Sequence, residues 1–264
     1  MRSRWLRVGA VAALCFLLSG LAVQAARGEV VKNGGFEEGF VYGVGKYWGS
    51  FDNGGLADCS FHDDDWDPVV RDGEHSQLIE ISTLAYGGSE PDRYAGIYQV
   101  VDVVPGARYD FTLHGMIRST EGTEEESEYG YRVEVGLDYA GGTDWQAVTD
   151  WTEMPWPEYP RLEPGAWKDY YASVYPTGNQ LTIFIRARKK FATTRQEGNI
   201  NIDTVSMMGS MPTGEPAPSV EPTPVAEADA PETMPVTGFG LAAPIAGALC
   251  GALALVARKL RLRG

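Results

Sequence analysis

The sequence is poor in cysteine. Of its three cysteines, Cys15 and Cys250 lie in the two long apolar runs near the ends, so Cys59 is alone between them. The part of the chain between these runs therefore cannot form an internal disulfide. A domain there has to be held together by a hydrophobic core, and the roughly 180 residues from Val30 to Ser210 are enough to form one.

Catalytic signatures are missing as well. The three histidines, His62, His75 and His114, form no HExxH pair, and no serine lies in a GxSxG motif. No glycine-rich phosphate loop follows an expected strand. These absences favour a binding protein over an enzyme. A polysaccharide hydrolase is the minor alternative, because glycosidases need only two carboxylates held about 5 to 10 Å apart.

Basic residues are scarce between the two ends of the chain. All 36 acidic residues lie between Glu29 and Glu232, whereas seven of the 22 basic residues fall in the terminal segments, which leaves a formal charge of −21 between them. This charge disfavours nucleic acid and anionic membranes as partners, since their phosphates require Lys and Arg. It is compatible with divalent cations and neutral glycans, and it also keeps an exported protein soluble.

Both ends of the chain predict export. Residues 1–25 combine three arginines, an apolar run from Val8 to Leu21 and a Val-Gln-Ala cleavage site, the pattern of a secretory signal peptide. Near the other end, nineteen apolar or small residues from Phe239 to Ala257 precede four basic residues. A helix of this length spans about 28 Å, close to the roughly 30 Å core of a bilayer, and the basic tail favours a cytoplasmic C-terminus.

The pentapeptide MPVTG at 234–238 comes directly before this apolar run. Pentapeptide, apolar helix and basic tail together resemble the cell-wall sorting signal that sortases read, in which the motif is usually LPxTG. The resemblance implies cleavage between Thr237 and Gly238, although Met234 stands where Leu is usual. The alternative is an uncleaved membrane anchor. In both cases the chain is attached to the cell wall or the plasma membrane by its C-terminus and faces the outside.

The chain divides into four regions. Residues 211–233 contain six prolines and few large apolar side chains, which predicts an extended spacer. The expected regions are a signal peptide at 1–25, a folded domain at 26–210, the spacer at 211–233 and the sorting signal at 234–264, with a transmembrane helix at 239–257.

Alternation of apolar and polar residues dominates the folded region. This period of two is the pattern of strands with one buried face. Seven strands are expected, at 77–81, 97–104, 109–117, 131–137, 166–174, 181–187 and 200–208. No amphipathic helix is evident between Val30 and Ser210. The sequence therefore predicts an all-β protein, an antiparallel β-sandwich formed by a single domain.

Five segments, in this order, carry a family resemblance. They are NGGFEEG at 33–39, VVRDGEHSQLIEIS at 69–82, GIYQVVDVVPGARYDFTLHGMIRS at 96–119, TIFIRAR at 182–188 and NIDTVSM at 201–207. Together they resemble the galactose-binding-like jelly rolls, a group that includes many bacterial carbohydrate-binding modules. The resemblance implies a jelly-roll fold for nearly the whole domain. Function transfers less directly, because this fold also serves as spacer, adhesion and protein-binding modules.

The resemblance also implies a structural calcium ion where the first loop meets the last strand. Calcium takes six to eight oxygen ligands, mainly carboxylates and carbonyls. At the matching positions, Glu37 and Asp203 would supply side-chain oxygens, while Asn33 and the loop around Gly73 would supply carbonyl oxygens. The alternative is that Asn33 only forms a turn and that Asp203 makes hydrogen bonds.

Aromatic residues crowd a proline-rich stretch between the strands expected at 131–137 and 166–174. Large rings in a rigid, irregular loop can form platforms on which the C–H faces of sugars stack, while carboxylates bond the hydroxyls. The sequence therefore predicts a noncatalytic glycan-binding module. The main alternative is a structural or adhesive surface protein in which these rings are buried. The expected ligand-binding residues are Trp145, Trp151, Trp156, Tyr159, Asp144 and Asp150.

Overall fold

The structure is a computed structural model that describes residues 26–85, 90–120, 122 and 130–212. In these ranges the only helices are two short 3-10 segments, η1 (Asp67–Val69) and η2 (Trp145–Ala147). The predicted signal peptide, sorting signal and transmembrane segment, and nearly all of the spacer, lie outside the described residues. Within the described ranges, no helix is long and apolar enough to cross a membrane.

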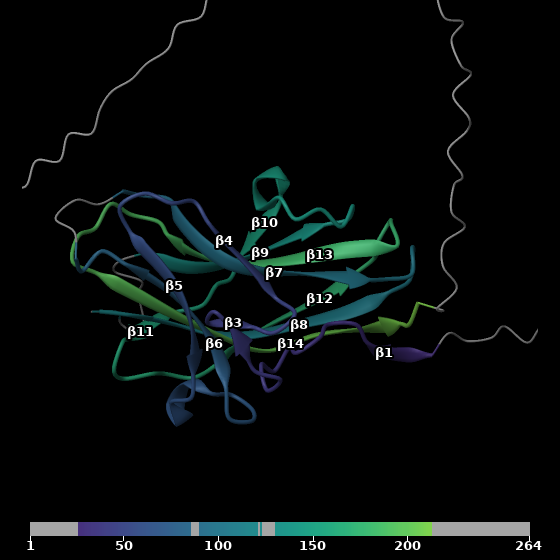
Figure 1. Cartoon of the computed structure of the whole chain (residues 1–264), viewed down its shortest axis with the longest axis horizontal. Coiled ribbons are helices and arrows are strands. Elements are labelled where there is room, and N and C mark those ends of the chain that lie inside the picture. Colours follow the sequence, from purple (N-terminus) through teal and green to yellow (C-terminus); the bar gives the residue numbers. More distant parts are fainter. Residues whose placement is uncertain (1–25, 86–89, 121, 123–129, 213–264) are drawn as a thin grey trace, which may run out of the picture. The chain divides into compact units, whose positions relative to one another are not determined.

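Two sheets face each other and form a β-sandwich (Figure 1). In the seven-stranded sheet the order is β11 (Glu158–Pro160), β8 (Tyr109–Ser119), β14 (Glu197–Ser210), β6 (Ser76–Ser82) and β5 (Asp58–Asp64), while β12 (Lys168–Val174) also pairs with β8 and β1 (Arg27–Glu29) with β14. In the five-stranded sheet the order is β10 (Trp151–Glu153), β9 (Tyr131–Asp138), β13 (Gln180–Lys189), β7 (Arg93–Asp102) and β4 (Gly49–Asp52).

The pairings within the two sheets are antiparallel, except that β11 runs parallel to β8. A separate hairpin is formed by β2 (Phe40–Val41) and β3 (Val44–Gly45). All seven expected strands are present, and the all-β antiparallel sandwich predicted from the sequence is confirmed. The strands β1 to β5, β10 and β11 are additional to the prediction.

The hydrophobic core fills the space between the sheets. Leu181, Ile183 and Ile185 of β13 are fully buried, as are Leu113 and Ile117 of β8. Burying an aliphatic side chain of this size contributes about 1.5 to 3 kcal/mol relative to leaving it in water. The alternation in β13 therefore fixes which face points inward. Its other face, with Phe184, Arg186 and Arg188, points away from the core.

Candidate functional site

The outer face of the five-stranded sheet carries a cluster of aromatic side chains, which we call the aromatic face. Its members come from five different elements of the chain, β4, β7, η2, β10 and β13. Phe184 is fully buried at its centre, whereas the other rings are half-buried. The members of the aromatic face are Phe51, Tyr94, Tyr98, Trp145, Trp151 and Phe184.

Two glycines on the neighbouring strands let these rings lie directly over the sheet. A Cβ atom at Gly96 of β7 would come within 2.4 Å of the Phe51 ring, and a Cβ atom at Gly136 of β9 would come within 3.0 Å of the Trp151 ring. Both glycines pair with outward-facing residues of β13. The bare backbone at these two positions is therefore what allows Phe51 and Trp151 to cover the sheet.

The rings contact one another in a continuous layer. Trp145 stacks on Phe51 with their centroids 5.1 Å apart and their planes 19° from parallel. Phe184 meets Phe51 edge to face at 5.9 Å and Trp151 at 6.3 Å. Such pairs add about 0.5 to 1.5 kcal/mol each beyond the area they bury. The layer is therefore preformed, with its partly exposed rings facing solvent.

Arg186 of β13 lies inside this aromatic layer. Its guanidinium carbon is 3.6 Å from the centroid of the Trp151 ring and 4.2 Å from that of Tyr94. Its Nε donates a hydrogen bond of 2.6 Å to Oε2 of Glu134 on β9. Burial lowers the pKa of Arg186, while the hydrogen bond to Glu134 raises it again. The result is a charged donor held in one orientation.

Glu134 is shared between two arginines. Its Oε1 accepts a hydrogen bond of 3.1 Å from Nη1 of Arg188, and Arg188 also donates to Oδ1 of Asp92 at 2.6 Å. Next to them, Arg132 pairs with Glu153 at 3.3 Å. Both oxygens of the Glu134 carboxylate thus accept hydrogen bonds, and they hold the Arg186 and Arg188 side chains in place on the aromatic face.

The structure brings Trp145 and Trp151 together but separates them from Trp156 and Tyr159. Trp156 is buried against Gly115, where a Cβ atom would lie 2.3 Å from the ring, and its Nε1 donates to the carbonyl of Asp169. Tyr159 is buried under the seven-stranded sheet. The prediction of open platforms is therefore wrong for Trp156 and Tyr159, because the pairing of β11 with β8 draws this segment onto the other sheet.

The two expected acidic partners also differ in position. Asp144 is exposed beside Trp145 and caps η2, its Oδ1 accepting a hydrogen bond from the backbone of Gln146. Asp150 instead lines a cavity of about 480 Å³, together with Phe111 and Tyr170. Asp144 therefore stays with the aromatic face, whereas Asp150 borders a different hollow.

Sequence reasoning missed the residues that complete the site. Arg186 and Phe184 stood on the outward face of an expected strand, but nothing in the local pattern shows which loop covers that face. Tyr94 and Phe51 reach it from β7 and β4, which pair with each other at the far edge of the sheet. Glycines inside predicted strands are the one available signal, because they mark close approach by another group.

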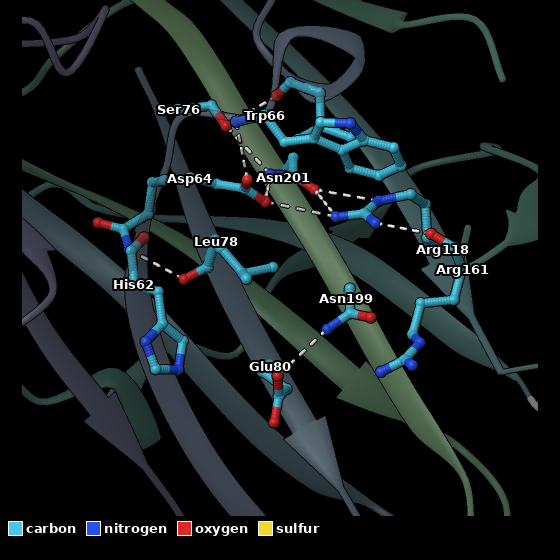
Figure 2. Close-up of polar contacts among 12 residues, drawn as sticks. His62, Asp64, Trp66, Ser76, Leu78, Glu80, Arg118, Arg161, Asn199 and Asn201 are labelled. Atoms are coloured by element: carbon cyan, nitrogen blue, oxygen red, sulfur yellow. Dashed lines mark hydrogen bonds and ion pairs between the residues drawn. The ribbon is translucent and has the colours of Figure 1, made fainter. Parts of the chain in front are cut away.

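Part of the outer face of the seven-stranded sheet carries a polar network instead (Figure 2). Arg118 donates to Oδ1 of Asn201 at 2.7 Å, and Nδ2 of Asn201 donates to Asp64 and to Ser76, each at 3.0 Å. Trp66 lies over Arg118, with the guanidinium carbon 5.4 Å from its ring centroid, and is 39% exposed. These buried groups satisfy one another, so the network fastens the Trp66 loop to the sheet.

Two of the predicted calcium ligands meet at one loop. Oε1 of Glu37 accepts hydrogen bonds of 3.0 Å from the backbone of Glu74 and of His75. Oδ2 of the fully buried Asp203 accepts from the backbone of Arg71 at 2.9 Å and of Asp72 at 3.2 Å. Burial raises the pKa of Asp203 to about 6, and nearby Glu37 adds to this, against the effect of the backbone hydrogen bonds.

Asn33 does not fit the predicted role. Its carbonyl oxygen accepts from the backbone of Phe36 at 3.2 Å and from Nε1 of Trp48 at 3.1 Å, which occupies both lone pairs. Its φ of +51° places it in a turn. Asn33 therefore forms the turn that the alternative expects. No group of three or more His, Cys, Asp or Glu side chains in the described part of the chain is arranged to hold a metal ion.

No protein-family model and no curated protein matches the sequence. Among solved structures, the chain is similar to a family 61 carbohydrate-binding module in complex with beta-1,4-galactotriose, at 15% identity over 68% of this chain and 97% of that one, with a TM-score of 0.40. A family 4 carbohydrate-binding module gives 14% identity, 68% and 99% coverage, and a TM-score of 0.38. The K3 adhesin domain of Lys-gingipain from Porphyromonas gingivalis gives 14%, 70% and 100%, and 0.43. At these values the similarities assign no ligand to this chain.

Proposed function

We propose that this protein is a noncatalytic carbohydrate-binding module that uses the aromatic face. The observation that carries the proposal is the pair of half-exposed indole rings, Trp145 and Trp151, beside the fixed guanidinium of Arg186. Sugar rings pack their C–H faces on such rings, while their hydroxyls bond neighbouring charged groups. A preformed layer of this kind binds without having to order its own side chains.

The carboxylates of the aromatic face support binding over hydrolysis. Both oxygens of Glu134 accept hydrogen bonds from arginines, Asp92 is paired with Arg188 and Glu153 with Arg132. A glycosidase needs one carboxyl group that can give up a proton and a second that is free to attack or to activate water. These three carboxylates, held by arginines, serve neither role well, and Asp144 accepts the backbone hydrogen bond that caps η2.

A glycan array probed with the purified protein tests this function. We expect binding to at least one class of glycan, and we expect it to fall at least about tenfold when Trp145 and Trp151 are both replaced by Ala. Trp66→Ala is the matched control, because it removes an exposed indole from the opposite sheet and should leave binding unchanged. Binding that survives the double substitution would place the site elsewhere. Absence of binding to any glycan would favour the adhesive or structural alternative.

The proposal includes display on the cell surface. It is supported by the signal-peptide pattern at 1–25 and by the MPVTG sequence, apolar run and basic tail at 234–264. Cell fractionation followed by mass spectrometry of the C-terminal peptide is the test. A peptide that ends at Thr237 and is joined to cell-wall material identifies sortase cleavage, whereas a chain that runs to Gly264 in the membrane fraction identifies the uncleaved anchor.

The proposal also includes a structural calcium ion near Glu37 and Asp203. Support comes from two carboxylates that face the same loop, one of them buried, and from the raised pKa of Asp203. Carbonyl oxygens of the loop around Gly73 would complete the ligand set in place of Asn33. Such an ion would fasten the first loop to the last strand by compensating their charge.

A further inference from the structure

We propose that Arg186 is the receptor for a carboxylate group of the bound glycan, so that the aromatic face selects acidic glycans built from uronic acids. This inference rests on the proposed carbohydrate-binding function and names the class of ligand. It assigns a binding role to a side chain that also helps to hold the sheet together.

The two terminal nitrogens of Arg186 are the unoccupied part of the site. Nε is used by Glu134, but neither Nη1 nor Nη2 has a hydrogen-bond partner among the described residues. Some buried polar atoms of the described residues lack a hydrogen-bond partner, but Nη1 and Nη2 are not among them. Both nitrogens therefore reach solvent, although the Arg186 side chain as a whole is only 9% exposed. The accessible edge of Arg186 is therefore an open pair of N–H donors at the end of a buried cation.

The geometry of this edge matches a carboxylate. The two terminal N–H groups of a guanidinium lie in one plane and can bond the two oxygens of a carboxylate in parallel. Trp151 and Tyr94 enclose the guanidinium at 3.6 and 4.2 Å, which fixes the orientation of that plane before any ligand arrives. Because the Arg186 side chain is mostly buried, the charge interaction is stronger here than at an open surface.

The charge around Arg186 also permits an anion. The ion pairs around Arg186 match Arg132, Arg186 and Arg188 with Glu134, Glu153 and Asp92, and the exposed Asp144 caps η2 beside Trp145. Glu134 divides its two oxygens between two arginines, so no carboxylate is devoted to Arg186 alone. In a chain whose central part carries a charge of −21, these acids are paired with arginines and the terminal edge of Arg186 is exposed. A ligand carboxylate would meet that edge without facing an unpaired acid there.

The test compares each ligand with its own methyl ester. The purified protein is titrated calorimetrically with oligomers of polygalacturonate, alginate and hyaluronan, each as the free acid and with its carboxylates methyl-esterified. We expect at least one acid form to bind about tenfold or more tightly than its ester, because esterification removes the charge and keeps the sugar rings. This comparison needs no substitution and so does not depend on the folding of a variant.

Substitutions then locate the effect. Arg186→Gln should abolish the difference between acid and ester, and Arg186→Lys, which keeps the charge but loses the planar fork, should retain only part of it. Arg108→Gln makes the same change in net charge at an exposed residue that pairs with Asp110, and should leave the difference intact. Unfolding curves of each variant identify any loss of fold, and binding of the esterified or neutral glycans measures the aromatic face alone.

The outcomes separate this inference from the proposed function. Neutral glycans that bind while no acid form is preferred over its ester would overturn the carboxylate receptor and leave the carbohydrate-binding function in place. An acid preference that persists in Arg186→Gln would also overturn it. Failure of every acidic and neutral glycan to bind would overturn both.

Discussion

The guanidinium carbon of Arg186 lies 3.6 Å from the centroid of the Trp151 ring, while Nε of Arg186 donates to Glu134. The Tyr94 ring centroid lies 4.2 Å from the same carbon, and the carboxylate holds the Nε edge of the cation. A charge this deeply enclosed is tolerated only while its hydrogen-bonded counter-ion is present. The binding face and the stability of the sheet thus depend on the same few groups.

Replacing Glu134 with Gln should destabilise the protein strongly. The carboxylate is 5% exposed and serves both Arg186 and Arg188, so its removal leaves two close cations without their shared counter-ion. We expect a loss of about 2 to 4 kcal/mol in the free energy of unfolding, measured by urea denaturation. Glu153→Gln is the control, because the Glu153 side chain is 39% exposed in its pair with Arg132, and it should cost less than about 1 kcal/mol. Equal losses in the two variants would contradict this account.

Replacing Gly115 with Ala should destabilise the protein through overpacking. An added Cβ atom would lie 2.3 Å from the Trp156 ring, which is itself buried and cannot retreat. The expected cost is about 1 to 3 kcal/mol, seen as a lower melting temperature. Gly35→Ala should change stability by less than about 0.5 kcal/mol, since nothing lies within 4 Å of its added Cβ atom. If Gly115→Ala is as stable as the parent, Trp156 is not packed as described.

Stability should rise with pH in the alkaline range because of Lys189. Burial, with a contribution from nearby Arg93, lowers the pKa of Lys189 from 10.5 to about 8. Between these values the unfolded chain binds more protons than the folded one, so the free energy of unfolding increases as pH rises from about 8 to about 10.5. We expect Lys189 to contribute about 1 to 3 kcal/mol, measured by urea denaturation at several pH values as the difference between the parent and Lys189→Met. The comparison is needed because burial raises the pKa of Cys59 from 9.0 to about 11, which lowers the stability of both proteins above pH 9. In Lys189→Met this rise should disappear, and an unchanged rise would assign it to another group.

Calcium should raise the melting temperature of the chelator-treated protein. An ion that binds only the folded state stabilises it by RT ln(1 + [L]/Kd), so the shift should grow with the logarithm of the calcium concentration. Asp203→Asn should remove this dependence by halving the carboxylate charge supplied by Asp203 and Glu37. The decisive quantity is the calcium-induced shift within each variant, because Asp203 also accepts backbone hydrogen bonds that stabilise the fold without metal. Identical melting curves of the parent with chelator and with calcium would remove the ion from the proposal.

The strands could be predicted because their signal is local. In β13, Leu181, Ile183 and Ile185 alternate with Thr182 and Phe184, and a strand with this pattern can bury only one of its faces. The strand β5 was not predicted, because its local pattern is weaker. Its outward positions hold Ser60, His62 and Asp64, and it is a sheet edge whose position depends on pairing with β6.

The candidate site could be predicted only in part. Trp145 and Trp151 were predicted because aromatic residues are dense in this proline-rich stretch. The same criterion selected Trp156 and Tyr159, which are buried. The density of aromatic residues cannot separate the two pairs, because the exposure of each ring depends on which sheet its segment joins. Trp151 begins a strand that pairs with β9 of the five-stranded sheet, whereas Tyr159 belongs to a strand that pairs with β8 of the seven-stranded sheet.

Alternation along the chain, which can bury only one face of each strand, was enough to predict an all-β domain, and composition was enough to predict its acidic charge and its candidate aromatic residues. Which aromatic rings remain partly exposed, and which cation lies among them, depends on how the strands pair. Arg186 meets Trp151, Tyr94 and Glu134 across three strands, because strand register sets which side chains become neighbours and no single segment contains that information.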